Sequence, residues 1–305
     1  VVSWTALISA CMDEGYLDEA MEIFHSMQLN GVNPDLISWN ALVYGLARNG
    51  EIALALLTLE EMQEKGLKPR VNSWNGIISG CVQNGYFKDA LDAFSNMLCF
   101  PEDPNSVTIA SILPACAGLK DLNLVRAVHG YALKCELYGN VHVEGSLIDM
   151  YAKCGRIDYA EKVFVKVENR NTAMWNEMIA AYVNERKMKE ALELLRLMKK
   201  DGLRPDVITY NTLLAGNARN GQMKETYDML YEMIRMGLKP DIVSFNVLIS
   251  GFQQSGLSYE ALKLFQIMQS NGCFLNQVLV ATSPNAVTTT GALAASADLN
   301  LLKQG

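Results

Sequence analysis

One period runs through this sequence, because the same short phrase returns every 35 residues. Trp4, Trp39 and Trp74 are spaced by 35 and stand in the phrases VVSWTALISA, LISWNALVYG and VNSWNGIISG. The phrase returns as TAMWNEMIAA, VITYNTLLAG and IVSFNVLISG, with Tyr210 and Phe245 in the aromatic place. A fixed period of about 20–50 residues is the signature of stacked repeats. The period therefore predicts a repeat array rather than the two globular domains that a length of 305 residues would otherwise suggest.

Further residues keep the same phase. They are Gly15, Gly50, Gly85, Gly221 and Gly256; Met27, Met62, Met97, Met198, Met233 and Met268; and Pro34, Pro69, Pro104, Pro205 and Pro240. These markers predict one array over 1–305. Its repeats are 1–35, 36–70, 71–105, 106–140, 141–171, 172–206, 207–241 and 242–276, with a partial repeat at 286–305 and an insertion or diverged junction at 277–285.

Each repeat is predicted to form two helices. In the first repeat the helical spacing i, i+3, i+4, i+7 is met by Trp4, Leu7, Ile8 and Cys11. Gly15 is expected to end that helix, and a second apolar stripe follows at Ala20, Ile23, Phe24 and Met27. A single hairpin of this kind cannot bury its apolar face alone. The sequence therefore predicts an all-α, right-handed α-solenoid (superhelix) of stacked helix-turn-helix repeats of about 35 residues.

Composition narrows the possible functions. The formal net charge is −7, which argues mildly against bulk attraction to phosphate. The seven cysteines contain no C-x-x-C, so neither a zinc knuckle nor a disulfide framework is expected. His142 and Glu144 echo half of a zinc deaminase signature whose cysteine half is missing. We expect no enzyme, cofactor, metal, small-molecule substrate or membrane span, and expect the chain, which starts without Met inside a repeat, to be a piece of a longer protein.

The repeat resembles the pentatricopeptide repeat (PPR) family. The resemblance rests on V-x-[ST]-[WYF]-N-x-L-I followed by Gly, Ala, Phe and Met, and on the closing phrases NGVNPD, KGLKPR, DGLRPD and MGLKPD. The segment GSLIDMYAKCGRIDYAEKVF and the ACAGL and H-G-Y phrases resemble the plant subfamily with mixed standard, long and short repeats. The resemblance implies binding to single-stranded RNA. It also implies a role in a plant organelle, chloroplast or mitochondrion, as an RNA-processing or cytidine-to-uridine editing specificity factor that works with editing-complex proteins.

Two polar places recur at fixed phase and are the candidate base-reading residues. The fifth place of the repeats holds Thr5, Asn40, Asn75, Asn176, Asn211 and Asn246. The closing place holds Asp35, Arg70, Asn105, Asn140, Asn171, Asp206, Asp241 and either Asn276 or, across the insertion, Asn285. Asn is a poor helix former that can donate and accept hydrogen bonds, so keeping it at one helical phase favours a base-reading role.

The resemblance also implies finer roles. It assigns base sandwiching to the second place, which holds Val2, Ile37, Val107, Ile208 and Val243. It makes the Thr5–Asp35 pair a guanine reader and the Asn–Asp pairs uracil readers. Asn–Asn pairs become pyrimidine readers favouring cytosine, whereas Asn40 with Arg70 departs from the pattern and implies only a pyrimidine. Because Ala110 and Gly145 stand at the fifth place of the fourth and fifth repeats, the expected preference is 5′-G-Y-Y-N-N-U-U-Y-3′.

Two other interpretations stay open at the level of sequence. Asn and Asp are favoured at helix starts, so the closing residues could be caps, alone or in addition to reading bases. The array could instead be a peptide-binding scaffold of the tetratricopeptide kind, which would suit an acidic chain. If RNA is bound, the negative charge implies that base contacts and a locally basic groove hold it.

Overall fold

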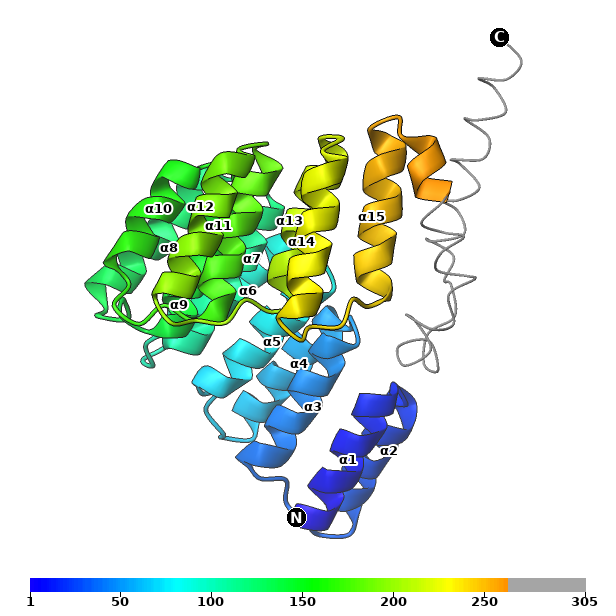
Figure 1. The fold of residues 1–305 in the computed structure, drawn as a ribbon. Coiled ribbons are helices and arrows are strands. Elements are labelled where there is room, and N and C mark those ends of the chain that lie inside the picture. Colours follow the sequence, from blue (N-terminus) through cyan, green and yellow to red (C-terminus); the bar gives the residue numbers. More distant parts are fainter. Residues whose placement is uncertain (263–305) are drawn as a thin grey trace. The chain divides into compact units, whose positions relative to one another are not determined.

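The structure is a computed structural model that describes residues 1–262, and within these residues it contains helices and no strand (Figure 1). The first helices of successive repeats are α1 (Val2–Glu14), α3 (Leu36–Arg48), α5 (Val71–Gln83), α7 (Ser106–Gly118), α9 (Val141–Lys153), α11 (Thr172–Asn184), α13 (Val207–Arg219) and α15 (Ile242–Gln254). The second helices are α2 (Leu17–Leu29), α4 (Ile52–Glu64), α6 (Phe87–Met97), α8 (Leu122–Lys134), α10 (Ile157–Lys166), α12 (Met188–Lys200) and α14 (Met223–Arg235). Residues 258–262 are also helical.

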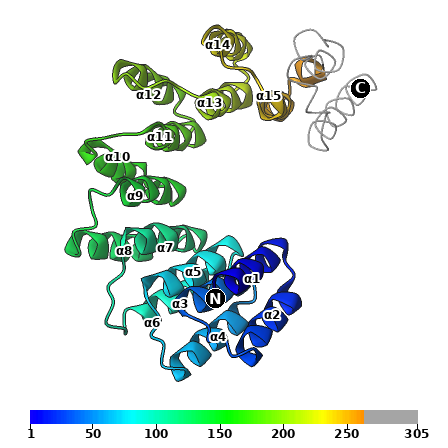
Figure 2. The same ribbon diagram turned by 90° about the horizontal axis from the view of Figure 1, so that it is seen from below.

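The chain divides into two compact bodies, Val1–Glu168 and Asn169–Gly305. In the N-terminal body each first helix packs on the next, in the order α1, α3, α5, α7, α9. In the described part of the C-terminal body the same row is α11, α13, α15. Within each body the second helices lie on one side of that row (Figure 2), and each of α2, α4, α6, α8 and α12 also touches the first helix of the next repeat. The all-α repeat solenoid fold is thereby confirmed, while the single array over 1–305 stays a prediction.

Local sequence sets the helix ends. Gly15 ends α1 in the left-handed region, with φ 82°, and its N–H bonds back to the last turn. A residue with a side chain is strained in that conformation, whereas glycine is not. Asp18 and Glu19 stand in the first turn of α2, where acidic groups complement the helix dipole. Both observations agree with the expected hairpin.

Four of the six aromatic anchors are buried in the core, as expected, whereas Trp4 and Phe245 are half-buried. Trp39, Trp74, Trp175 and Tyr210 are buried. The prediction for Leu7 was wrong, because its side chain is 53% exposed. The equivalent residues Leu42, Ile77 and Ile112 are buried because the first helix of the preceding repeat packs beside them, and no such helix lies beside α1 in this structure.

Neighbouring first helices approach closely at the tenth place of the repeat. A Cβ atom built on Gly80 would lie 2.5 Å from the backbone carbon of Ala47 and 2.6 Å from its oxygen. Gly251 meets the Cβ atom of Ala218 on the neighbouring first helix at 2.5 Å, whereas Gly45 and Gly216 meet the flexible side chains of Met12 and Met188 at 2.4–2.5 Å. The absence of a side chain at Gly80 therefore sets the separation of α3 and α5, which carry the candidate site.

None of the described helices is both long and apolar enough to cross a membrane. No group of three or more His, Cys, Asp or Glu side chains in residues 1–262 is placed to hold a metal ion. Cys81 and Cys116 are fully buried, and burial raises the pKa of both thiols to about 12. These two thiols stay protonated at neutral pH and behave as small packing residues.

Candidate nucleic-acid interface

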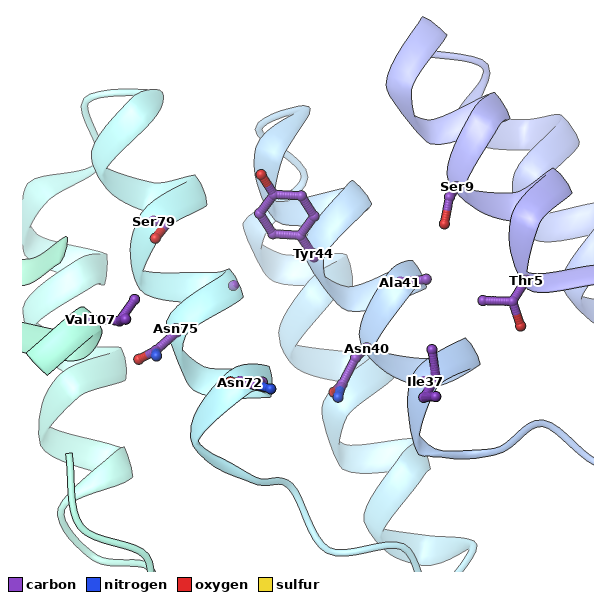
Figure 3. A pocket seen from close by; sticks show the side chains of 11 residues that line it. Thr5, Ser9, Ile37, Asn40, Ala41, Tyr44, Asn72, Asn75, Ser79 and Val107 are labelled. Atoms are coloured by element: carbon purple, nitrogen blue, oxygen red, sulfur yellow. The ribbon is translucent and has the colours of Figure 1, made fainter. Parts of the chain in front are cut away.

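A hollow of about 510 Å³ opens along the first helices of the N-terminal body. Its lining comes from α1, α3, α5 and the start of α7 (Figure 3). Five candidate residues are among those that line it, namely Thr5, Asn40 and Asn75 of the fifth place and Ile37 and Val107 of the second place. The structure thus gathers predicted base-reading and base-sandwiching side chains on one surface, which we call the groove.

Four asparagines at the fifth place, Asn40, Asn75, Asn176 and Asn211, are each joined to the next repeat by the amide oxygen. That oxygen accepts a hydrogen bond from a Ser or Thr hydroxyl 33 residues later, at the third place of the following helix. The pairs are Ser73–Asn40 at 2.6 Å, Thr108–Asn75 at 2.7 Å, Thr209–Asn176 at 2.6 Å and Ser244–Asn211 at 2.7 Å. Thr5 and Ser38 share a hydroxyl–hydroxyl bond of 2.7 Å in the same position. The recurrent asparagine thus has a structural reason to keep its phase, in addition to any role in base reading.

Where the closing residue is Asn or Asp, the amide nitrogen of the preceding asparagine reaches it. Nδ2 of Asn75 donates to Oδ1 of Asn105 at 3.4 Å, Nδ2 of Asn176 to Asp206 at 3.1 Å, and Nδ2 of Asn211 to Asp241 at 3.4 Å. Three predicted pairs are therefore brought together by direct hydrogen bonds, one in the N-terminal body and two in the C-terminal body.

The closing residues are also helix caps. Oδ1 of Asp35, Asn105, Asp206 and Asp241 accepts from the backbone N–H three residues later at 2.8–3.0 Å. Asn140 and Asn171 cap α9 and α11 through Oδ1 in a similar way. The capping interpretation is correct for these residues. The cap and the bond to the preceding asparagine both use Oδ1 of the closing residue. Within the described part of the chain, Oδ2 of Asp206, Oδ2 of Asp241 and Nδ2 of Asn105 therefore form no hydrogen bond.

The first two pairs are joined differently. Thr5 and Asp35 do not bond to each other, and both instead contact the hydroxyl of Ser38. Arg70 has no acceptor for the Asn40 amide, and its guanidinium lies 4.0 Å from Glu102. Glu102 also accepts a hydrogen bond from the Val71 N–H at the start of α5, at 3.0 Å.

The fourth, fifth and eighth repeats have no predicted base-reading pair that lies entirely within the described residues. Ala110 and Gly145 stand at the fifth place on α7 and α9 and carry no polar side chain. Asn246 lies on α15, while its two alternative partners, Asn276 and Asn285, lie outside the described residues.

The aliphatic residues of the second place are exposed although they are apolar. The exposed fractions are 84% for Val2, 68% for Ile37, 55% for Val107, 63% for Ile208 and 50% for Val243. Each of these five side chains thus leaves half or more of its apolar surface uncovered at the same phase of its helix.

Charge is absent from much of the first-helix row. No Lys, Arg, Asp or Glu stands on α5, α7 or α15, and α3 and α13 carry one arginine each. The expectation of a locally basic groove was therefore wrong for these helices, because their positions are filled by packing residues and neutral polar groups. Attraction to phosphate is weak on such a surface.

The two closing aspartates are held ionised. Burial alone would raise the pKa of Asp206, but hydrogen bonds from the Thr209 N–H and hydroxyl and from Asn176 outweigh it, so the pKa lies below its ordinary value. The same balance lowers the pKa of Asp241, with Ser244 and Asn211 as donors. At neutral pH each aspartate therefore offers acceptors and no donor.

Sequence reasoning missed two kinds of residue at this surface. One is the hydroxyl at the third place, which was visible as [ST] in the repeat phrase but was given no role. The other is Tyr44, a 41% exposed aromatic side chain in the groove that stands one helical turn beyond Asn40 on α3 (Figure 3). An aromatic residue at a place where the neighbouring repeats have Ser9 and Ser79 was the available signal.

Stacked helical hairpins with a recurrent polar face define a helical-repeat protein. Three models of the same repeat match the chain. The PPR repeat family model covers 1–47, 170–219 and 205–254, the pentatricopeptide repeat domain model covers 25–84, and the PPR repeat model covers 72–100, 145–172 and 243–273. Together they span 1–100 and 145–273, and the chain belongs to the pentatricopeptide repeat family.

Known proteins agree with this membership. A pentatricopeptide repeat-containing protein of Arabidopsis thaliana is 40% identical over 118 residues, which is 37% of this chain and 23% of the relative. A chloroplastic one is 41% identical over 107 residues (35% and 12%), and a mitochondrial one is 38% identical over 122 residues (40% and 19%). Each match thus covers less than a quarter of the relative's own length.

A solved structure shares the fold. The pentatricopeptide repeat protein PPR10, in complex with an 18-nt psaJ RNA element, superposes with a TM-score of 0.72 at 24% identity. The match covers 92% of this chain and 40% of that chain.

Proposed function

We propose that this chain binds single-stranded RNA and reads one base with each repeat that carries a polar fifth residue. The observation that supports it most is the coupled pair of polar side chains, one at the fifth place and one at the closing place, at the same phase of successive helices. Exposed aliphatic side chains lie at the second place of most of the same helices. The RNA complex of PPR10 supports the same proposal by fold likeness.

The unused hydrogen-bonding atoms explain the expected base preferences. In an Asn–Asp pair, one amide N–H goes to the aspartate and the second N–H stays available beside the free Oδ2. A donor next to an acceptor matches a carbonyl oxygen and the N3–H of uracil. In the Asn75–Asn105 pair the free group of the closing residue is an amide nitrogen. Two donors match O2 and N3 of cytosine.

Exchange of the closing residue tests this reading. RNA of the form 5′-G-Y-Y-N-N-U-U-Y-3′ is titrated against versions in which both uracils become cytosine or adenine. Asp206→Asn with Asp241→Asn should move the preference from uracil to cytosine by about tenfold at each place, the effect of one hydrogen bond to a charged group. The caps should survive, because Asn105 caps α7 in the same manner.

The reciprocal variant is the matched control. Asn105→Asp should move the preference at the third nucleotide from cytosine to uracil and leave the sixth and seventh unchanged. Equal binding of wild-type protein to all these RNAs would refute base reading by these pairs.

In the plant cell we propose an organelle RNA-processing or editing specificity role for the whole protein. The chloroplastic and mitochondrial names of the relatives support it. Recovery of RNA bound to the tagged full-length protein from purified organelles tests it. Bound transcripts should carry the predicted octamer, and cytoplasmic transcripts without it would contradict the proposal.

A further inference from the structure

We propose that a Ser or Thr hydroxyl at the third place of a repeat is a positioning residue for the base-reading asparagine of the repeat before it. The inference rests on the proposed function and adds a residue class to it. The hydroxyl does not touch RNA. It fixes which end of the asparagine amide faces the closing residue, and thereby which base the pair prefers.

The Thr209 hydroxyl and the ionised Asp206 favour the same orientation of the Asn176 amide. Its hydroxyl oxygen accepts from the backbone N–H of Asp206 at 3.1 Å. Two acceptors lie within reach of its single proton, Oδ1 of Asn176 at 2.6 Å and Oδ1 of Asp206 at 2.9 Å, and the closer one is Asn176. With Oδ1 held there, Nδ2 must point at the aspartate, which it does at 3.1 Å.

The same geometry recurs at Thr108, which is fully buried in the N-terminal body. Its hydroxyl accepts from the Asn105 N–H at 3.1 Å and donates to Oδ1 of Asn75 at 2.7 Å. Here the closing residue is neutral and would tolerate either amide orientation. The hydroxyl is then the group that decides it.

The chain itself contains the matching exceptions. Where the fifth residue is Ala110, the third residue of the next repeat is Val143, which is fully buried. Where the fifth residue is Gly145, the next third residue is Met174. A hydroxyl is thus present after each of Thr5, Asn40, Asn75, Asn176 and Asn211, and is replaced by an apolar side chain after both residues that lack a polar group.

The loss experiment uses Thr209→Val and Thr209→Ser. Affinity is measured for RNAs with uracil or cytosine at the sixth nucleotide. Thr209→Val should reduce the ratio of the affinity for uracil RNA to that for cytosine RNA by about tenfold. Thr209→Ser should keep the wild-type ratio, because the hydroxyl of Ser244 makes the same hydrogen bond to Asn211. Thr226→Val is the control, since that hydroxyl is equally buried but bonds only its own helix at Gln222. A purely structural hydroxyl would weaken both RNAs equally and leave the ratio intact.

A spectroscopic readout separates this inference from the proposed function. The side-chain amide protons of Asn176 should be protected from exchange in wild-type protein and in Thr209→Ser, and should lose that protection in Thr209→Val, all without RNA. Unchanged protection in Thr209→Val overturns the positioning role whether or not RNA binds. Wild-type protein that shows protection but no base preference overturns the proposed function alone.

The gain experiment introduces an asparagine at the fifth place of the fourth repeat, which has no polar side chain there, and a hydroxyl at the third place of the next repeat. Ala110→Asn and Val143→Thr are made singly and together on α7 and α9, which pack on each other. With Asn140 as the closing residue, the double variant should acquire a cytosine preference at the fourth nucleotide. Ala110→Asn alone should gain little, and equal selectivity of that single variant and the double variant would overturn the inference.

Discussion

Replacing Gly80 by alanine tests the packing that sets the width of the groove. The added Cβ would lie 2.5–2.6 Å from backbone atoms of Ala47, where about 3.4 Å is the ordinary closest approach, so α3 and α5 must separate by close to 1 Å. Backbone cannot rotate away as a side chain can. Overpacking of this kind costs about 1–3 kcal/mol. Alanine regains about 1 kcal/mol of helix propensity, so the free energy of unfolding should fall by about 0–2 kcal/mol.

Gly130→Ala is the matched control for this prediction. Gly130 also lies inside a helix, α8, and has no atom within 4 Å of the added Cβ. It should gain about 0.5–1 kcal/mol of stability from propensity alone. Urea unfolding followed by circular dichroism measures both variants. A Gly80→Ala protein as stable as Gly130→Ala would show that the close approach is not a constraint, and our account of the α3–α5 separation would fail.

Three further predictions concern the hydrogen bonds and charges of the interface. Thr108→Val should lower the free energy of unfolding by about 1–3 kcal/mol in urea titration, because it leaves the buried Oδ1 of Asn75 unsatisfied; no loss of stability would count against the inter-repeat bond. Because the pKa of Asp206 and of Asp241 is lowered in the folded protein, their contribution to stability is present above the ordinary aspartate pKa of about 4 and is lost as pH falls through the folded values. Unfolding midpoints should therefore hold from pH 7 to about 5 and fall below about 4, with a smaller fall in the Asp206→Asn/Asp241→Asn protein. The basic residues on the described first helices are Arg48, Lys153 and Arg219. A plot of the logarithm of RNA affinity against the logarithm of salt concentration should therefore have a slope of about −2. A slope steeper than about −5 would contradict a neutral groove.

The repeat period was sufficient to predict the helices and most of the core. Trp39, Trp74 and Trp175 were expected inside because an aromatic residue at one helical phase has to be packed by the next hairpin, and they are buried. The predicted burial of Leu7 was wrong for the same physical reason. Its burial depends on a neighbouring helix, which a pattern within one repeat does not specify.

The repeat phase predicted where the candidate side chains lie, but it did not predict which hydrogen bonds they form. The sequence showed Asn75 and Asn105 thirty residues apart, and the structure joins them at 3.4 Å. The hydroxyl of Thr108 is in the next repeat, 33 residues from Asn75, so local pattern gave no reason to pair them. Arg70 was recognised as an exception, yet its approach to Glu102 depends on how the following loop folds back.

The separation of charge between the two helix layers has an electrostatic consequence for how a polyanion can approach the N-terminal body. The helix α2 carries Asp18, Glu19 and Glu22 and α4 carries Glu60, Glu61 and Glu64, with no lysine or arginine on either helix. A phosphate chain that approaches this layer is repelled, whereas along α5 and α7 it meets no fixed charge of either sign. The acidic balance of the chain therefore does not oppose RNA as a whole. It disfavours RNA along α2 and α4 and leaves the uncharged helices α5 and α7 as the side of lower repulsion.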